Sequence, residues 1–206
     1  MRLQGGHLGW HACSWQAGIL AALNAGVHSI EHVSYLDEEC AELMLKKGAL
    51  FCATRTIVEY GLAHLEELPE PNRARLVAVA RTGEEAYASA VRMGVKIALG
   101  TDIGVASPTI GLVHGTNGIE FSYAVKAGLS PLAAIEAGTA NAPKVLGARA
   151  PRSGQLREEF DADFIGLSAN PLEDIKVLAD AANVTHVWKA GKIEKAPGRP
   201  AGLLPL

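Results

Sequence analysis

The sequence contains few cysteines, few aromatic residues and no long apolar run. Its three cysteines, Cys13, Cys40 and Cys52, are odd in number and lack Cys-x-x-Cys spacing, which argues against a disulfide framework or a cysteine zinc site. Aromatic residues make up 5% and no Lys/Arg block occurs, so a nucleic-acid surface is not expected. No run approaches the ~20 apolar residues of a membrane span, and no export signal is recognisable at the N-terminus. We therefore expect a cytoplasmic protein.

The composition is that of a globular protein. Hydrophobic residues make up 49%, charged residues 20%, and the formal net charge is -3. A length of 206 residues allows one domain, or one domain with an appendage, but it is short for a complete eight-fold barrel, which typically needs about 250 residues. The charge leaves a small neutral or cationic partner open as a substrate.

Strand and helix patterns alternate from the start of the chain to Gly147. Strands are predicted at Leu8–Cys13, Val27–His32, Ala49–Ala53 and Val95–Asp102, and helices at Gln16–Asn24, from the cap Asp37 to Lys47, and at Asn72–Met93. Alternation of this kind indicates βα units and a parallel sheet, which is an α/β fold.

Two further helices are expected after Asp102. Asn117, with Glu120 three residues later, resembles a capping box. Ser130-Pro131 opens the second helix, which we expect to run to about Leu146. From Ala150 the pattern changes to one that predicts short antiparallel strands, so we place a domain boundary between residues 1–149 and 150–206.

The stretch VKIALGTD at Val95–Asp102 has the pattern of a barrel strand. Val95, Ile97 and Leu99 form a bulky face suited to packing under helices, whereas the opposite face is small. Asp102 falls at the carboxyl end of this strand, where a carboxylate can bind a metal or move a proton. A turn or helix-cap role explains Asp102 equally well at this point.

Two histidines close other predicted strands. His32 ends Val27–His32, with Glu31 expected to point the opposite way, toward the helices, and His11 ends the first, weaker strand. Two imidazoles and one carboxylate at successive strand ends suit an open zinc site, in which three protein ligands leave a position for water. A core histidine at His32 and an unconstrained terminal residue at His11 are the alternatives.

Substrate-binding candidates lie in the predicted connections at the same edge. Arg55, Tyr60 and His64 follow the strand Ala49–Ala53 in a connection that we expect to pass through Pro69 and Pro71. Arg55 could bind a carboxylate through its planar guanidinium, or the segment could be a solvated loop. His114, ahead of the next helix, could contact substrate or only a backbone group.

These residues also carry a resemblance to a known family. The segments AALNAGVHSIEHVSYLDEE, IALGTDIG, HGTNGIEFSYAVKAGLSPLAAIEAGTANAPKVLGA and ADFIGLSANPLEDI…VWKAGKI resemble the C-terminal half of the amidohydrolase superfamily, in its imidazolonepropionase-like and Xaa-Pro dipeptidase-like branch. The resemblance extends from Ala17 to Ile193. It implies a metal-dependent hydrolase of amide or peptide C–N bonds in cyclic amides, N-acyl amino acids or dipeptides, with zinc as the expected metal.

The resemblance also implies a fold and a role for each site residue. Residues 1–149 would be the C-terminal part of a (β/α)8 TIM barrel, about strands five to eight, and residues 150–206 part of a small β-sandwich. His32 matches the metal-binding His of the sixth strand, and Asp102 matches the Asp of the eighth, which binds metal and handles the proton of the attacking water. His11 matches the fifth-strand His less closely, because the spacing is offset by one residue.

Other metal ligands of the family have no counterpart in this sequence. The family's early His-x-His pair and its bridging Lys are missing, so the sequence resembles half of an enzyme. We therefore expect either a homo-oligomer or a complementary N-terminal half as partner. A catalytically incomplete fragment that acts by binding or assembly is the alternative function.

Overall fold

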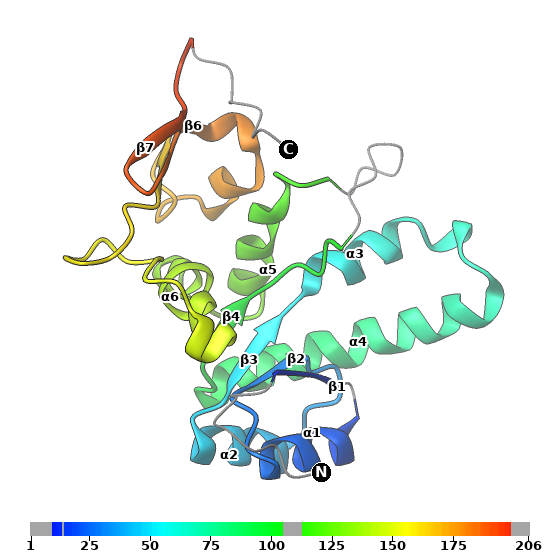
Figure 1. The fold of residues 1–206 in the computed structure, drawn as a ribbon. Helices are drawn as coiled ribbons and strands as arrows, with labels where there is room; N and C mark the ends of the chain where they lie inside the picture. Colours follow the sequence, from blue (N-terminus) through cyan, green and yellow to red (C-terminus); the bar gives the residue numbers. More distant parts are fainter. Residues whose placement is uncertain (1–9, 14, 105–112, 199–206) are drawn as a thin grey trace.

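The computed structural model describes residues 10–13, 15–104 and 113–198 (Figure 1). This part of the chain contains a four-stranded parallel sheet and a three-stranded antiparallel sheet. The strands of the parallel sheet lie in chain order: β1 (Trp10–Cys13), β2 (Ser29–His32), β3 (Leu50–Ala53) and β4 (Ile97–Leu99). Because Cys13 pairs with His32 and Ala53 with Leu99, the strands end together at one edge. The predicted parallel α/β arrangement is confirmed.

Helices follow each strand of the parallel sheet: those up to α4 connect successive strands, and those from η3 onward come after β4. They are α1 (Gln16–Asn24), α2 (Glu38–Lys47), α3 (Arg55–Ala63), η1 (Leu65–Glu67), α4 (Glu70–Met93), η3 (Asn117–Ile119), α5 (Glu120–Lys126), α6 (Pro131–Glu136), η4 (Ala137–Asn141) and η5 (Ala142–Arg149). Figure 1 shows α1 and α2 together beside β1 and β2, whereas α3 and α4 form a hairpin that extends away from the sheet.

The caps of α2 agree with the sequence. The Asp37 side chain accepts a hydrogen bond from the Cys40 N–H at 2.9 Å, and Gly48 ends the helix with a φ of 66°. A left-handed φ of this size is easy for glycine and costly for residues with a Cβ. Local sequence alone therefore determines both ends of this helix.

One face of the parallel sheet packs against the helices. Ile30, Phe51 and Ile97 are buried there, in one cluster with residues from α1, α2 and α4. Glu31 lies on the opposite face, since it pairs with Cys52 in the register and its carboxyl interacts with the Cys52 thiol. The expectation that Glu31 points toward the helices is wrong, because Ile30 takes that face and side chains alternate along a strand.

The segment after β3 is helical, and the expectation of an irregular connection there is wrong. α3 begins at Arg55, directly after β3, and α4 begins at Glu70, earlier than predicted. Pro71 lies in the first turn of α4, where a missing N–H costs no intrahelical hydrogen bond. The prolines thus mark the start of a helix and not a long loop.

The helix opened by Ser130 is shorter than predicted. The Ser130 hydroxyl accepts a hydrogen bond from the Ala133 N–H at 3.2 Å, as expected for an N-cap, but α6 ends at Glu136. A short π-helix, η4, and a 3₁₀ segment, η5, continue the chain. Pro143 has no N–H to donate to the preceding turn, so regular α-helix cannot pass through this position.

The antiparallel sheet contains β5 (Phe164–Leu167), β6 (Val184–Lys189) and β7 (Lys192–Lys195), with η6 (Ile175–Ala179) and η7 (Ala181–Asn183) between β5 and β6. The Phe164 and Trp188 rings stack across β5 and β6 with centroids 4.4 Å apart. Antiparallel strands were predicted for this segment and are confirmed. Within the described residues, no helix combines the length and apolar character that crossing a membrane requires.

Candidate active site at the carboxyl ends of the parallel strands

His32 and Asp102 lie together at the carboxyl edge of the parallel sheet. His32 is the last residue of β2, and Asp102 follows β4 after a short extension. Nε2 of His32 is 4.0 Å from Oδ2 of Asp102, and the side chains are 30% and 53% exposed. An imidazole and a carboxylate therefore meet in a position that solvent and a small molecule can reach.

The backbone at both residues departs from strand geometry. His32 has a φ of 68°, Val33 of 48° and Asp102 of 56°, all in the left-handed region. Such angles cost non-glycine residues of order 1 kcal/mol or more, and they persist where the surrounding structure holds them. At His32 the turn also breaks the alternation of β2, which would otherwise direct this side chain to the same face as Ile30.

Thr54 contacts Nδ1 of His32, the ring nitrogen other than the one that approaches Asp102, and it was not among the site residues predicted from the sequence. The Thr54 hydroxyl oxygen lies 2.7 Å from Nδ1 of His32. Thr54 directly follows β3, the strand between β2 and β4 in the sheet. A polar residue immediately after the predicted strand Ala49–Ala53 was the signal that could have identified it.

Glu120 is the second residue that the sequence did not reveal. It is 1% exposed, and its carboxylate accepts hydrogen bonds from the Arg55 N–H at 2.7 Å, the Thr56 N–H at 2.7 Å and the Thr56 hydroxyl at 2.5 Å. The predicted capping box is wrong, because Asn117 Oδ1 accepts from the Gly115 N–H and Glu120 binds the start of α3 instead. Burial raises the pKa of Glu120, and the hydrogen bonds from Thr56 and Arg55 partly offset that effect.

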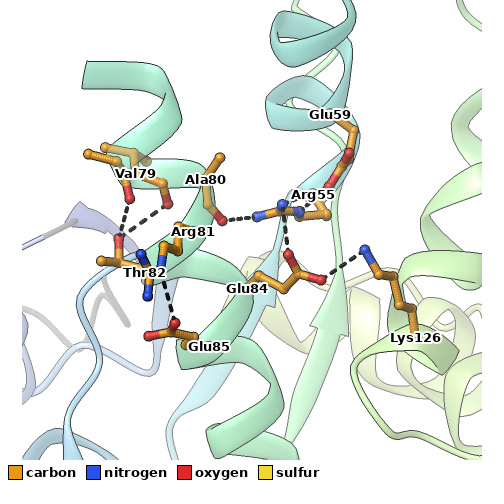
Figure 2. Close-up of polar contacts among 10 residues, drawn as sticks. Arg55, Glu59, Val79, Ala80, Arg81, Thr82, Glu84, Glu85 and Lys126 are labelled. Carbon is orange, nitrogen blue, oxygen red and sulfur yellow. Dashed lines mark hydrogen bonds and ion pairs between the residues drawn. The ribbon is translucent and has the colours of Figure 1, made fainter. Parts of the chain in front are cut away.

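Arg55 is held within the α3–α4 hairpin. Figure 2 shows its guanidinium between Glu59 and Glu84, with a further hydrogen bond of 2.6 Å to the Ala80 carbonyl. Nη2 of Arg55 lies 2.6 Å from Oε1 of Glu59 and 3.7 Å from Oε2 of Glu84, and the Arg55 side chain is 10% exposed. The sequence suggested that the Arg55 guanidinium binds a substrate carboxylate. In the structure this guanidinium is already bound by Glu59, Glu84 and the Ala80 carbonyl.

The other candidates for substrate contact lie outside the His32–Asp102 pair. Tyr60 is on α3, and its ring stacks on His64 with centroids 4.1 Å apart. His114 is exposed in the turn before η3. The structure therefore brings together His32 and Asp102 among the predicted site residues, whereas Tyr60 packs along the hairpin.

The two cysteines whose side chains the structure describes, Cys40 and Cys52, are buried thiols. Cys52 is 6% exposed, and burial together with Glu31 raises its thiol pKa. Cys40 is fully buried, and burial followed by interaction with Asp37 raises its pKa to about 12. A buried thiol with a raised pKa is a poor nucleophile at neutral pH, so neither Cys40 nor Cys52 is a candidate nucleophile.

The donors at the edge fit part of a divalent metal site. Imidazole nitrogen and carboxylate oxygen are standard zinc ligands, and here one ends β2 and the other follows β4. Among the side chains that the structure describes, no group of three His, Cys, Asp or Glu converges as a metal site. His11 lies in β1, where its Cα pairs with Ile30, but its side chain is outside the described residues. The described side chains supply two donors of the expected three.

Comparisons with known proteins point to one family. The amidohydrolase family pattern matches residues 7–193. Ochratoxinase from Aspergillus niger is 50% identical over 185 residues, which are 89% of this chain and 37% of that protein. The A. niger ochratoxinase crystal structure is similar with a TM-score of 0.79 and 48% identity, covering 93% of this chain and 42% of that one. A Xaa-Pro dipeptidase crystal structure with bound methionine has a TM-score of 0.78 and 33% identity, covering 90% and 44%. The chain thus spans less than half the length of these relatives.

Proposed function

The chain belongs to the amidohydrolase family, and on that premise we propose that it forms part of a metal-dependent hydrolase that cleaves amide-type C–N bonds. The substrate class that we propose is cyclic amides, N-acyl amino acids or dipeptides. The dipeptidase among the similar structures supports the peptide-type substrates, and the ochratoxinase relatives support the family branch.

One observation carries this proposal: the 4.0 Å approach of His32 Nε2 to Asp102 Oδ2 at the carboxyl edge of the sheet. Active sites of α/β barrels lie at this edge, and conserved chemistry there comes from residues at the ends of different strands. A buried structural pair would be shielded from solvent, whereas these side chains are partly exposed.

The chemistry of each residue follows from its position. A bound divalent ion, which we propose to be zinc, would lower the pKa of a water molecule and polarise the substrate carbonyl. His32 would be a ligand through Nε2, Asp102 through its carboxylate, and His11 is the proposed third ligand. Asp102 would also accept the proton of the attacking water and return it to the leaving nitrogen, a role that its partly exposed carboxylate supports. Tyr60 and His114 remain proposed substrate contacts.

We further propose that β1 to β4 are barrel strands five to eight and that residues 150–206 form part of a separate β-sandwich domain. The chain-order parallel sheet and the change to antiparallel strands support this division. Four strands cannot close a barrel, so the proposal includes a complementary N-terminal half or a second copy of the chain as partner.

The test of this function is hydrolysis that depends on metal. The chain would be assayed with N-acyl amino acids and dipeptides after chelator treatment and after addition of zinc, alone and with a chain that supplies the N-terminal barrel half. We expect turnover only with zinc present. Equal turnover in chelator-treated and zinc-loaded protein would contradict the proposal.

A second candidate function is assembly without catalysis, and an apolar groove favours it. The groove has a volume of about 1030 Å³ between the parallel sheet, η4, η5 and the antiparallel sheet, and its lining includes Cys52, Leu99, Phe121, Ile165 and Trp188. Two of these, Ile165 at 48% exposure and Phe121 in part, present apolar surface to solvent. Stable association without turnover in the assay above would favour this function.

A further inference from the structure

The N-terminus of α3 is capped in an unusual way. Thr54 occupies the N-cap position, where a threonine hydroxyl ordinarily accepts a hydrogen bond from the second or third N–H of the helix. The Thr54 side chain makes no such bond. Its hydroxyl instead lies 2.7 Å from Nδ1 of His32.

Glu120 supplies the cap that Thr54 does not. Its carboxylate accepts the N–H groups of Arg55 and Thr56, the first two residues of α3, each at 2.7 Å. These N–H groups have no partner within the helix, and the positive end of the helix dipole favours a carboxylate beside them. Glu120 is the first residue of α5, which follows β4 in the sequence. Its hydrogen bonds therefore also connect α5 to the residues that directly follow β3.

The two arrangements are linked through Thr54. If the cap from Glu120 were absent, the Thr54 hydroxyl would be the nearest acceptor for the free N–H groups of its own helix. A hydroxyl oxygen that turned toward those groups would leave Nδ1 of His32. The tautomer and orientation of an imidazole are set by the hydrogen bond that its second nitrogen makes.

We propose that Glu120 is a positioning residue of the candidate site: by capping α3 in place of Thr54, it leaves the Thr54 hydroxyl to accept a hydrogen bond from Nδ1–H of His32. The lone pair of Nε2 is then directed to the space beside Asp102. This inference rests on the proposed function for its purpose, but its physical content concerns the His32 imidazole alone.

The geometry distinguishes this role from a purely structural one. A buried carboxylate with three hydrogen bonds stabilises any fold, so loss of stability in a Glu120 variant is uninformative by itself. The state of the His32 ring is informative, because the hydrogen bonds of Glu120 go to the start of α3 and not to His32. Thr54 and Glu120 should therefore act on His32 as one unit.

The experiment measures the His32 ring nitrogens by ¹⁵N NMR on the metal-free 206-residue chain. Glu120→Gln and Thr54→Val would be compared with the parent, singly and together. In the parent we expect the form protonated at Nδ1, and in each single variant a shift toward the form protonated at Nε2. The double variant should give the same His32 signals as Thr54→Val, because both changes remove the same hydrogen bond between Thr54 and His32. Thr54→Ser, which keeps the hydroxyl, should give the same His32 signals as the parent.

A matched control removes a different helix cap. Ser130→Ala deletes the hydroxyl that caps α6 and should lower stability by about 1 kcal/mol without moving the His32 signals. Should Glu120→Gln fail to fold, Thr56→Ala removes one of the three bonds to Glu120 and should move the His32 signals in the same direction by less.

Metal affinity provides a second measurement. Zinc binding at His32 should weaken by about 10-fold or more in Glu120→Gln and Thr54→Val, as is typical when the partner of a ligating histidine is lost. Unchanged His32 signals in a folded Glu120→Gln variant would overturn the positioning role even if the enzyme is a hydrolase. Conversely, shifted signals in a chain without zinc binding or turnover would support the positioning role and contradict the proposed function.

Discussion

Oδ2 of Asp102 lies 4.0 Å from Nε2 of His32, although β3 separates the strands that carry these two residues. The left-handed backbone at His32 and at Asp102 accompanies this approach across the intervening strand. Thr54, at the end of β3, lies against the other side of the imidazole. Residues from three strands are thus needed to place one imidazole beside one carboxylate.

Asp102→Asn should abolish hydrolysis while preserving the fold. Asparagine tolerates a φ of 56° as well as aspartate does, so the turn should survive. It cannot accept the proton of the attacking water, and loss of that function typically lowers the rate by ~10²–10⁴-fold. The measurement is turnover of N-acyl amino acids and dipeptides, with Asp180→Asn as a control, since Asp180 caps η7 far along the chain. Activity of Asp102→Asn within a few-fold of the parent would remove Asp102 from the mechanism.

Two Gly→Ala substitutions should have opposite effects on stability. A Cβ at Gly118 would overlap the carbonyl oxygen of Leu178, so the packing of η3 against η6 must open. Overpacking of this kind typically costs about 1–3 kcal/mol. Gly83, within α4, has only ordinary contacts at 3.7 Å or more, and alanine there should add roughly 0.5–1 kcal/mol of helix stability. Urea unfolding of both variants tests this, and equal stabilities would show that the η3–η6 contact is not close.

The pair formed by Glu84 and Lys126 should contribute stability that depends on pH. Nζ of Lys126 lies 2.8 Å from Glu84, and this hydrogen bond is the main cause that lowers the Glu84 pKa (Figure 2). A carboxyl whose folded pKa is depressed stabilises the fold above its unfolded pKa and loses that effect as the pH falls through the folded value.

Lys126→Met should therefore cost about 0.2–1 kcal/mol at neutral pH, because both side chains are at least half exposed. The difference from the parent should vanish in acid, below the ordinary carboxyl range. Unfolding free energies at a series of pH values measure this. Arg81→Met is the control, since Arg81 and Glu85 are 84% and 69% exposed and 3.4 Å apart. A difference that persists unchanged into acid would exclude the ion pair as its cause.

The apolar groove should determine association. Ile165 lines the groove and is 48% exposed, whereas Leu172 is 49% exposed and does not line it. Ile165→Lys should weaken association with a second copy or with the complementary half by roughly 10-fold or more, because a lysine charge would be desolvated at the contact. Leu172→Lys should leave it unchanged. Analytical sedimentation of each variant measures this association. Equal association of the Ile165→Lys and Leu172→Lys variants would show that the association surface is not the groove.

Much of the architecture could be predicted from local sequence. The caps of α2 at Asp37 and Gly48, and the N-cap at Ser130, depend on groups within a few residues of each other. The apolar positions Ile97 and Val95 likewise mark the face that packs on the helices. Two segments were predicted wrongly. The start of α3 depends on hydrogen bonds to the distant Glu120. The chain after α6 contains Pro143, which interrupts a regular helix.

The sequence by itself determined that His32 ends a strand and that Asp102 closely follows one, although β4 ends at Leu99 and not at Asp102 as predicted. The period of two and the turn residues after each strand are local properties. Tertiary structure alone decided what surrounds them. Glu120 looked like a local capping residue, yet its carboxylate binds the start of α3. Thr54 carried no motif, yet it contacts His32 because β3 lies between β2 and β4. The physical reason is that a buried carboxylate takes the hydrogen-bond donors nearest in space, and packing of the sheet and helices decides which donors those are.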